Sequence, residues 1–123
     1  MSLSSSIPTI DVNEAQRRLR DDPAAPILLD VREPNEFAAV RAPGAVLVPT
    51  SRFLERIGDL PADRPLLVVC HAGSRSAAVT AYLIRSGRTD VVNVAGGMDA
   101  WERAGLPIQR GPVAAGEGEL PAR

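Results

Sequence analysis

The sequence predicts a single α/β domain in which helices cover both faces of a parallel sheet. Short apolar runs at Ile27–Val31, Leu66–Val69 and Val91–Val94 are nearly continuous, which is typical of strands buried on both faces. Segments with helical spacing of their apolar residues separate these runs, so strand and helix alternate. The chain has 123 residues, enough for one hydrophobic core and too few for a second.

The elements of the first half follow from local signals. Asp11 and Glu14 have the spacing of a capping box, which predicts a helix that runs to about Arg20. The strand at 27–31 comes next, and Pro34 then suits the first turn of a short helix that ends near Val40.

The next segment turns at Pro43–Gly44 and predicts a strand at 45–48 and a helix at 51–57. Three apolar residues are expected on one side of that helix, namely Phe53, Leu54 and Ile57. The second half continues with the strand at 66–69, which has the strongest signal, and a helix from Arg75 to Ser86.

The strand at 91–94 and a last helix over 98–104 complete the alternation. Gly96 and Gly97 are expected to form a tight turn, and Trp101 is expected to anchor the core. Phe37 and Tyr82 are also expected in the core.

Composition excludes several kinds of chemistry. All 14 basic residues are Arg, so a Schiff-base lysine and a phosphate-loop lysine are excluded. One Cys and one His cannot build a four-ligand zinc site, and a lone Cys cannot form an internal disulfide. The net charge is −1 without blocks of like charge, so neither a nucleic acid nor a membrane is expected as a partner. Met1–Ile10 has no features of a signal peptide or anchor, and a cytoplasmic location is expected.

The candidate chemistry lies at Cys70, which directly follows a buried strand and directly precedes a helix. Ligands of open parallel sheets bind beyond the carboxyl ends of the strands. A helix start offers unpaired N–H groups that favour a thiolate, the reactive form of cysteine. Gly73 lets the loop curl so that its amides point inward. A small buried hydrophobic residue is the alternative for Cys70.

Arg75 lies in the first turn of that helix, where the helix dipole opposes a cation. Three arrangements remain open for it. It is paired with a carboxylate, aimed at a bound anion, or solvated, and pairing is the first choice.

Four segments resemble the signatures of rhodanese-family domains, in the same order along the chain. They are Leu28–Phe37 (LLDVREPNEF), Pro43–Ala45 (PGA), Val68–Ser76 (VVCHAGSRS) and Val94–Trp101 (VAGGMDAW). The third segment is similar to the active-site loop of that family, of the form Cys-x-x-Gly-x-Arg-Ser. The similarity extends over about residues 9–108, leaving an N-terminal extension at 1–8 and a tail at 109–123.

The resemblance implies a five-stranded parallel sheet with helices on both faces. It implies that Cys70 takes sulfane sulfur from a donor such as thiosulfate and passes it to cyanide, a thiol or an acceptor protein. It implies no metal and no cofactor, because the cysteine carries the sulfur. The implied substrate-binding residues are His71, Ala72, Gly73, Ser74, Arg75 and Ser76. Asp30 and Arg32 match residues expected beside the loop to hold it in place.

The chain departs from the family at Val40, Arg41 and Ala42, where Gly-His-Ile is common. Arg41 is therefore expected to point to solvent. Residues 111–123 are rich in Gly, Pro, Ala and Glu without periodicity, which predicts a disordered tail whose deletion changes neither stability nor activity.

Two other functional classes stay open beside the sulfurtransferase. One is a phosphatase or arsenate reductase, because related folds use a loop from Cys to Arg to bind an anion. The other is a carrier or binding module that receives sulfur from a partner protein. Four residues separate Cys70 from Arg75, whereas five are usual in the related phosphatases, which favours sulfur transfer.

Overall fold

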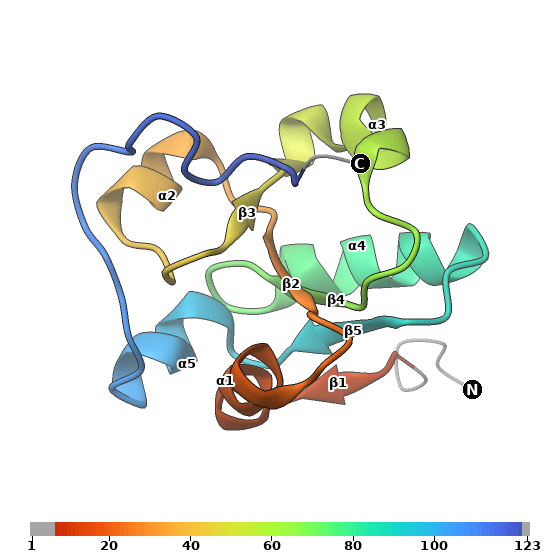
Figure 1. Cartoon of the computed structure of the whole chain (residues 1–123), viewed down its shortest axis with the longest axis horizontal. Helices are drawn as coiled ribbons and strands as arrows, with labels where there is room; N and C mark the ends of the chain where they lie inside the picture. The colour runs from red at the N-terminus through yellow and green to blue at the C-terminus, as the bar shows by residue number, and fades with distance from the viewer. Residues whose placement is uncertain (1–6, 122–123) are drawn as a thin grey trace.

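The computed structural model describes residues 7–121 and has one sheet of five parallel strands in the order β1-β5-β4-β2-β3 (Figure 1). The strands are β1 Thr9–Ile10, β2 Ile27–Asp30, β3 Val46–Leu47, β4 Leu66–Val69 and β5 Val91–Val94. The helices are α1 Val12–Asp21, α2 Pro34–Ala39, α3 Phe53–Arg56, α4 Ser74–Arg85 and α5 Gly97–Arg103, with 3₁₀ turns η2 Thr50–Arg52 and η3 Ile57–Asp59 around α3. The predicted fold class is confirmed.

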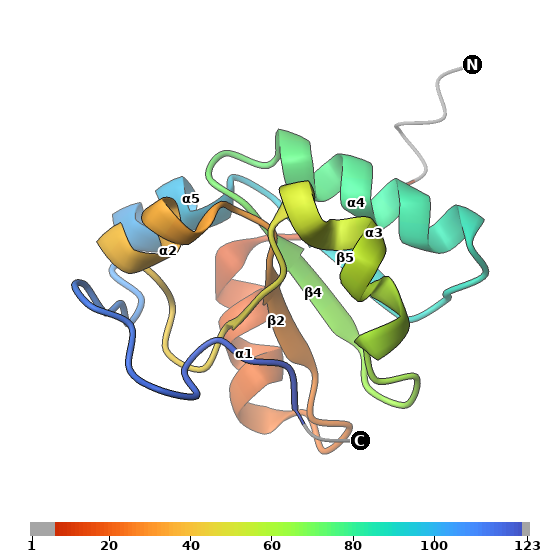
Figure 2. The same cartoon turned by 90° about the horizontal axis from the view of Figure 1, so that it is seen from above.

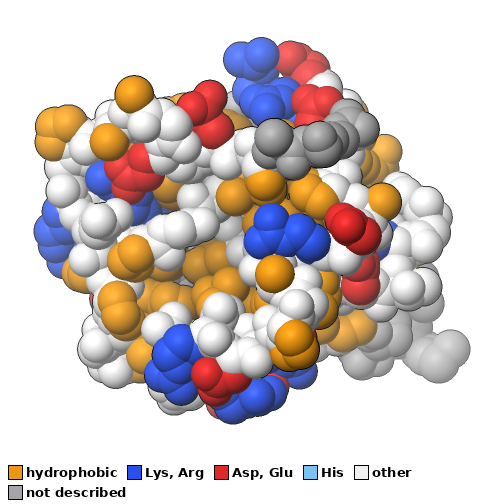
Figure 3. Space-filling view, viewed as in Figure 1, with side chains coloured by type: hydrophobic (Ala, Val, Ile, Leu, Met, Phe, Trp, Pro, Cys, Tyr) orange, Lys and Arg blue, Asp and Glu red, His pale blue; other side chains and the backbone are white. Residues whose placement is uncertain are grey.

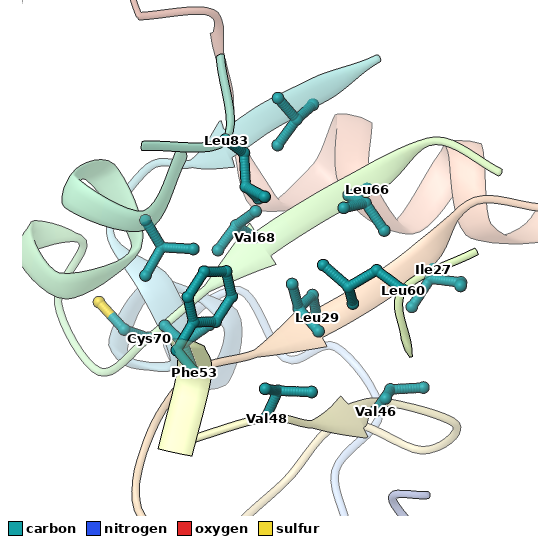
Figure 4. Close-up of a cluster of buried hydrophobic side chains, with 13 residues drawn as sticks. Ile27, Leu29, Val46, Val48, Phe53, Leu60, Leu66, Val68, Cys70 and Leu83 are labelled. Atoms are coloured by element: carbon teal, nitrogen blue, oxygen red, sulfur yellow. The ribbon is translucent and has the colours of Figure 1, made fainter. Parts of the chain in front are cut away.

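Two hydrophobic clusters lie on the two faces of the sheet because successive residues of a strand point to opposite sides. In β4, Leu66 and Val68 belong to the cluster that packs under α3 and α4, part of which is shown in Figure 4. Leu67 and Val69 belong to the cluster under α1 and α5, which contains Trp101. The central strand β4 is thus buried on both faces, and the residue that follows it is held firmly at the edge of the sheet.

The edge strand β1 escapes the sequence patterns because it has only two residues. It is held by β5, whose neighbour Ala95 donates its amide to the carbonyl of Ile10 at 2.8 Å. Asn93 likewise donates its amide to Pro8 at 2.8 Å. A pair of residues carries no periodicity, so only its partner strand reveals it.

Several predicted details of the helices are confirmed and others are wrong. Asp11 caps α1 by accepting the amide of Glu14 at 2.8 Å, but the Glu14 carboxylate pairs with Arg17 and Arg18 instead of closing the box. Phe37 and Trp101 are buried as predicted.

Tyr82 is not in the core, because 39% of it is exposed on the outer side of α4. Its ring packs edge to face on Phe53 at 6.3 Å between ring centres. Leu54 does not share the buried side of α3 with Phe53 and is 69% exposed. Both errors have one cause: an apolar residue next to a buried one on a helix points about 100° away from it.

The prediction of a disordered tail is also wrong for the described part of residues 109–121, which we call the C-terminal strap. The strap leaves α5, passes α2 and runs to the edge strand β3 (Figures 1 and 2). Gln109 exchanges two backbone hydrogen bonds with Arg41, and the carbonyl of Gly118 accepts the amide of Leu47 at 2.7 Å. Leu120 packs against the core. Backbone pairing to an edge strand needs no periodic apolar pattern, so composition alone could not reveal it.

The surface carries interspersed charges of both signs, with hydrophobic side chains between them, on the face seen in Figure 3. Among residues 7–121, no helix has the length and apolar character needed to cross a membrane.

Candidate active site

Cys70 lies where β4 ends, one residue beyond Val69 and four residues before the start of α4 at Ser74 (Figure 4). The residue is buried, with 1% of its surface exposed. β4 has β2 on one side and β5 on the other, so Cys70 sits at the carboxyl edge in the middle of the sheet. This is the place where parallel sheets bind ligands.

The loop after Cys70 curls around its sulfur atom. The amide of Gly73 donates to Sγ at 3.1 Å, and the Ser76 hydroxyl lies 3.3 Å from Sγ. Gly73 has φ of 116°, a conformation that favours glycine and that turns its amide inward. The structure therefore has the inward-pointing amide predicted for this loop, and Gly73 makes the turn that was expected of it.

The Ser76 hydroxyl has one proton and two neighbours that can accept it. It donates to the carbonyl of Gly73 at 3.1 Å and also lies within hydrogen-bond reach of Sγ. When Cys70 is a thiol, the S–H can donate to Ser76 while Ser76 donates to Gly73. When Cys70 is a thiolate, the hydroxyl can rotate to donate to the sulfur, so it serves both protonation states.

The loop lowers the pKa of the Cys70 thiol. Burial of the sulfur opposes ionisation, but the hydrogen bond from the Ser76 hydroxyl and the backbone amides of Ser76, Gly73 and Arg75 outweigh it. The direction agrees with the expectation for a thiol at a helix start. Because several donors point at Sγ, Cys70 ionises at a lower pH than a free thiol does.

The start of α5 holds the outer side of the loop. The amide of Met98 donates to the carbonyl of Cys70 at 2.7 Å, and that of Asp99 donates to the carbonyl of His71 at 2.9 Å. Gly97 makes this approach possible, since a Cβ there would lie 2.3 Å from the carbonyl oxygen of Cys70. The predicted tight turn at Gly96 and Gly97 is confirmed. The turn also brings the amides that donate to the carbonyls of Cys70 and His71, a contribution that sequence patterns did not show.

Arg75 is paired with a carboxylate, the first of the three arrangements considered for it. Its two terminal nitrogens donate to the two carboxylate oxygens of Glu36 at 2.7 and 2.9 Å. Glu36 Oε1 also accepts the amide of Glu33 at 3.0 Å. The Arg75 guanidinium, opposed by burial and helped by the Glu33 amide, holds the pKa of Glu36 at about 2.

Glu36 is the site residue that sequence reasoning missed. It lies 39 positions before Arg75, and nothing in the local pattern links them. The signal that could have found it is the expected pairing of Arg75, combined with the strand order. In this sheet β2 neighbours β4, so the segment that follows β2 lies beside the loop that follows β4.

Asp30 and Arg32 form a buried bidentate ion pair, with contacts of 2.8 to 3.2 Å between guanidinium and carboxylate. Arg32 also donates to the carbonyls of Glu36 at 3.3 Å and Val40 at 2.7 Å. The pair therefore holds the second half of α2, from Glu36 to the residue after the helix. It reaches the Cys70 loop through α2, an indirect form of the support expected for it.

The remaining predicted substrate-binding residues differ in exposure. Ser76 is buried, Gly73 and Arg75 are partly exposed, and the exposed residues that form the rim are His71, Ala72 and Ser74. Within residues 7–121, no group of three or more His, Cys, Asp or Glu side chains is placed to hold a metal ion.

Comparison with known proteins agrees with this geometry. Residues 11–104 match the family model of the rhodanese-like domain. The chain belongs to the rhodanese-like domain family. A sulfurtransferase of Allochromatium vinosum is 37% identical over 99 residues, which are 80% of this chain and 92% of that relative. The thiosulfate sulfurtransferase GlpE of Vibrio cholerae is 35% identical over 100 residues, 81% of this chain and 92% of that enzyme.

A rhodanese-related protein of Thermoplasma volcanium has a similar structure, with a TM-score of 0.76 and 29% identity. The match covers 83% of this chain and 97% of that one. The predicted family and the predicted enzyme class, a sulfurtransferase of the rhodanese type, are thereby confirmed.

The rhodanese-like chain departs from its family at Arg41, and the prediction that this side chain points to solvent is wrong. Arg41 is 3% exposed. Its guanidinium pairs with Glu117 of the C-terminal strap, lies over the Phe37 ring at 5.5 Å and donates to the carbonyl of Gly111 at 2.8 Å. At the position where the chain departs from the family pattern, Arg41 forms a buried ion pair that joins the rhodanese-like core to the strap.

Proposed function

We propose that this protein moves sulfane sulfur from an anionic donor such as thiosulfate to a thiol or cyanide through a persulfide on Cys70. The observation that carries the proposal is the position of Sγ, within reach of the Gly73 amide and the Ser76 hydroxyl in a loop held from behind. Thiosulfate sulfurtransferase is also the name of the GlpE relatives. A nucleophilic cysteine must stay reduced to react, which suits the cytoplasmic location that we propose.

The proposed reaction has two substitution steps at sulfur. The Cys70 thiolate attacks the outer sulfur of thiosulfate, the S–S bond of the donor breaks, and sulfite leaves with its electron pair. The resulting persulfide anion on Cys70 is then attacked at its outer sulfur by cyanide or a thiolate. The new bond forms to the acceptor, the Cys–S–S bond breaks, and the Cys70 thiolate returns.

The loop donors suit both charged states of this cycle. The Gly73 amide and the Ser76 hydroxyl can donate to the Cys70 thiolate before the first step and again when it returns in the second. His71, Ala72 and Ser74 line the rim, where the donor and the acceptor enter. An acceptor protein would present its thiol at this rim.

Phosphate chemistry is less well supported by the geometry. The Arg75 guanidinium is held by both oxygens of Glu36, so it is committed to that carboxylate and is not free to close over an anion. The loop between Cys70 and Arg75 has four residues and contains no carboxylate that could protonate a leaving alkoxide.

Intact-mass spectrometry tests the proposal. Thiosulfate should add one sulfur atom to the native protein, and cyanide should then remove it. Cys70→Ser should take up no sulfur, with an unchanged circular dichroism spectrum. The same native preparation should release no product from an aryl phosphate. Sulfur uptake by Cys70→Ser, or phosphate hydrolysis that depends on Cys70 without sulfur uptake, would show the proposal to be wrong.

A further inference from the structure

The C-terminal strap contributes one residue, Glu117, to a buried ion pair with Arg41. Arg41 Nε and Nη2 both donate to the Glu117 carboxylate, the second at 3.1 Å. The Arg41 side chain is 4% exposed and that of Glu117 is 21% exposed. A buried cation that loses its carboxylate is strongly destabilised, so the position of Arg41 depends on the strap.

The same guanidinium organises the carboxyl end of α2. Its Nη1 lies 3.4 Å from the carbonyl oxygens of Phe37 and Ala38, both in the last turn of the helix. The last carbonyls of a helix have no partner within the helix, and a cation is favourable there. Arg41 therefore lies against the carboxyl end of α2.

Further contacts join the strap to α2. The amide of Gly111 donates to the carbonyl of Ala38 at 2.9 Å. Gly118 lies against the Phe37 ring, where a Cβ would come within 3.1 Å of two ring atoms. The strap thus contacts two adjacent residues in the last turn of α2, and Arg41 contacts the same two residues.

α2 also carries Glu36, the residue that holds Arg75 of the Cys70 loop. Glu36 and Phe37 are neighbours on this six-residue helix, so a shift of the helix that moves Phe37 also moves Glu36. The contacts form a continuous chain from Glu117 through Arg41, α2 and Glu36 to Arg75.

We propose that Arg41 and Glu117 are positioning residues for the chemistry at Cys70, and that the C-terminal strap is a working part of the active site. The strap sets the position of α2, and α2 sets the position of Arg75 and of the loop amides around the sulfur. The kinetic part of this proposal rests on the proposed sulfur transfer. The ionisation of Cys70 tests it independently of that function.

The experiment compares Glu117→Gln with Glu119→Gln in the full chain. Both variants remove one negative charge from the strap, but Glu119 is exposed and lies outside the Arg41 contact. The first measurement is the rate of Cys70 alkylation by iodoacetamide as a function of pH. The second is kcat and KM for transfer from thiosulfate to cyanide.

We expect the alkylation profile of Glu117→Gln to move to higher pH, because loosened loop amides stabilise the thiolate less. We expect kcat/KM for thiosulfate to fall about threefold or more, the usual size of an effect transmitted through packed residues. Glu117→Asp should recover part of the loss, and Glu119→Gln should match the native protein. A purely structural strap would change the melting temperature without moving the alkylation profile.

A second variant covers the case in which Glu117→Gln does not fold. Arg41→Met combined with Glu117→Gln removes both charges, so no unpaired cation remains buried, while the carbonyls of α2 still lose their donor. The proposal is wrong if folded Glu117→Gln, or the folded double variant, has the Cys70 alkylation profile and the kcat/KM of the native protein. If the native protein transfers no sulfur, the proposed function fails, and the alkylation profiles still decide the positioning role.

Discussion

Two arginine–glutamate pairs hold α2, one through Glu36 on the helix and one through Arg41 just after it, and they differ in how exposed they are to water. The Arg75–Glu36 pair lies beside the Cys70 loop, with 35% and 29% of the side chains exposed. The Arg41–Glu117 pair lies under the C-terminal strap, and its arginine is 4% exposed. Exposed pairs contribute little to stability, whereas breaking a buried pair costs several kcal/mol. The comparison therefore separates a pair that positions the loop from a pair that also holds the fold together.

The largest effect is expected when the buried pair is lost with its segment. Deleting residues 111–123 removes Glu117, the Gly118 bond to β3 and the packing of Leu120. We expect the free energy of unfolding to fall by about 2–4 kcal/mol, which is ~10 °C in melting temperature for a domain of this size. Differential scanning calorimetry measures it.

The control for this deletion is a chain shortened only after Leu120, which keeps Glu117 and Gly118. It should melt like the native protein. An equal melting temperature for all three chains would mean that the strap contributes nothing, as its composition alone had suggested.

The partly exposed pair should behave in the opposite way, with a large effect on activity and a small one on stability. Arg75→Ala should lower kcat/KM for thiosulfate about tenfold, because the loop loses its contact with Glu36. The free energy of unfolding should fall by only about 1 kcal/mol. Steady-state kinetics and urea unfolding measure the two effects on the same preparation.

Arg85→Ala is the matched control, since Arg85 is an exposed arginine of the same helix. It should change neither quantity. A turnover of Arg75→Ala equal to that of the native protein would show that the pair does not position the loop.

Sequence patterns predicted that Arg75 is paired but not that its partner is Glu36, and they missed the Arg41–Glu117 pair entirely. The Cys70 loop was predictable because its signals are local: a buried strand, a glycine and a helix start within a few residues. Glu36 lies 39 positions from Arg75, and Glu117 lies 76 positions from Arg41. Such contacts depend on which strands are neighbours and on where the chain returns, and neither periodicity nor composition encodes that.

The fold itself was predictable where an element buries a periodic face. The three four-residue strands and the main helices follow from apolar runs and helical spacing, and the two-residue β3 follows from the turn at Pro43–Gly44. β1 has two residues, and the C-terminal strap is held mainly by backbone hydrogen bonds and two ion pairs, so neither presents such a face. Arg41 shows the same limit, because a charged residue is predicted to be exposed unless its partner is known.

The smallest effect should appear in acid, where the Arg75–Glu36 pair is lost. In the folded protein the pKa of Glu36 is about 2, below its ordinary value of 4.5. A lowered pKa means that the unfolded chain binds the proton more readily, so the stabilisation is complete above about pH 4.5 and is lost as pH falls toward 2. Urea unfolding of the native protein and of Glu36→Gln measures the difference at each pH.

That difference should be about 1 kcal/mol at neutral pH, should shrink as pH falls below 4.5 and should vanish only below the folded pKa of about 2, because a protonated Glu36 resembles the glutamine. Glu14 and Glu117 also have lowered pKa values, so the native protein loses stability in acid from several carboxylates at once. Both chains share those groups, and the subtraction isolates Glu36. A difference that stays constant down to pH 2 would mean that the carboxylate charge of Glu36 contributes nothing to holding Arg75.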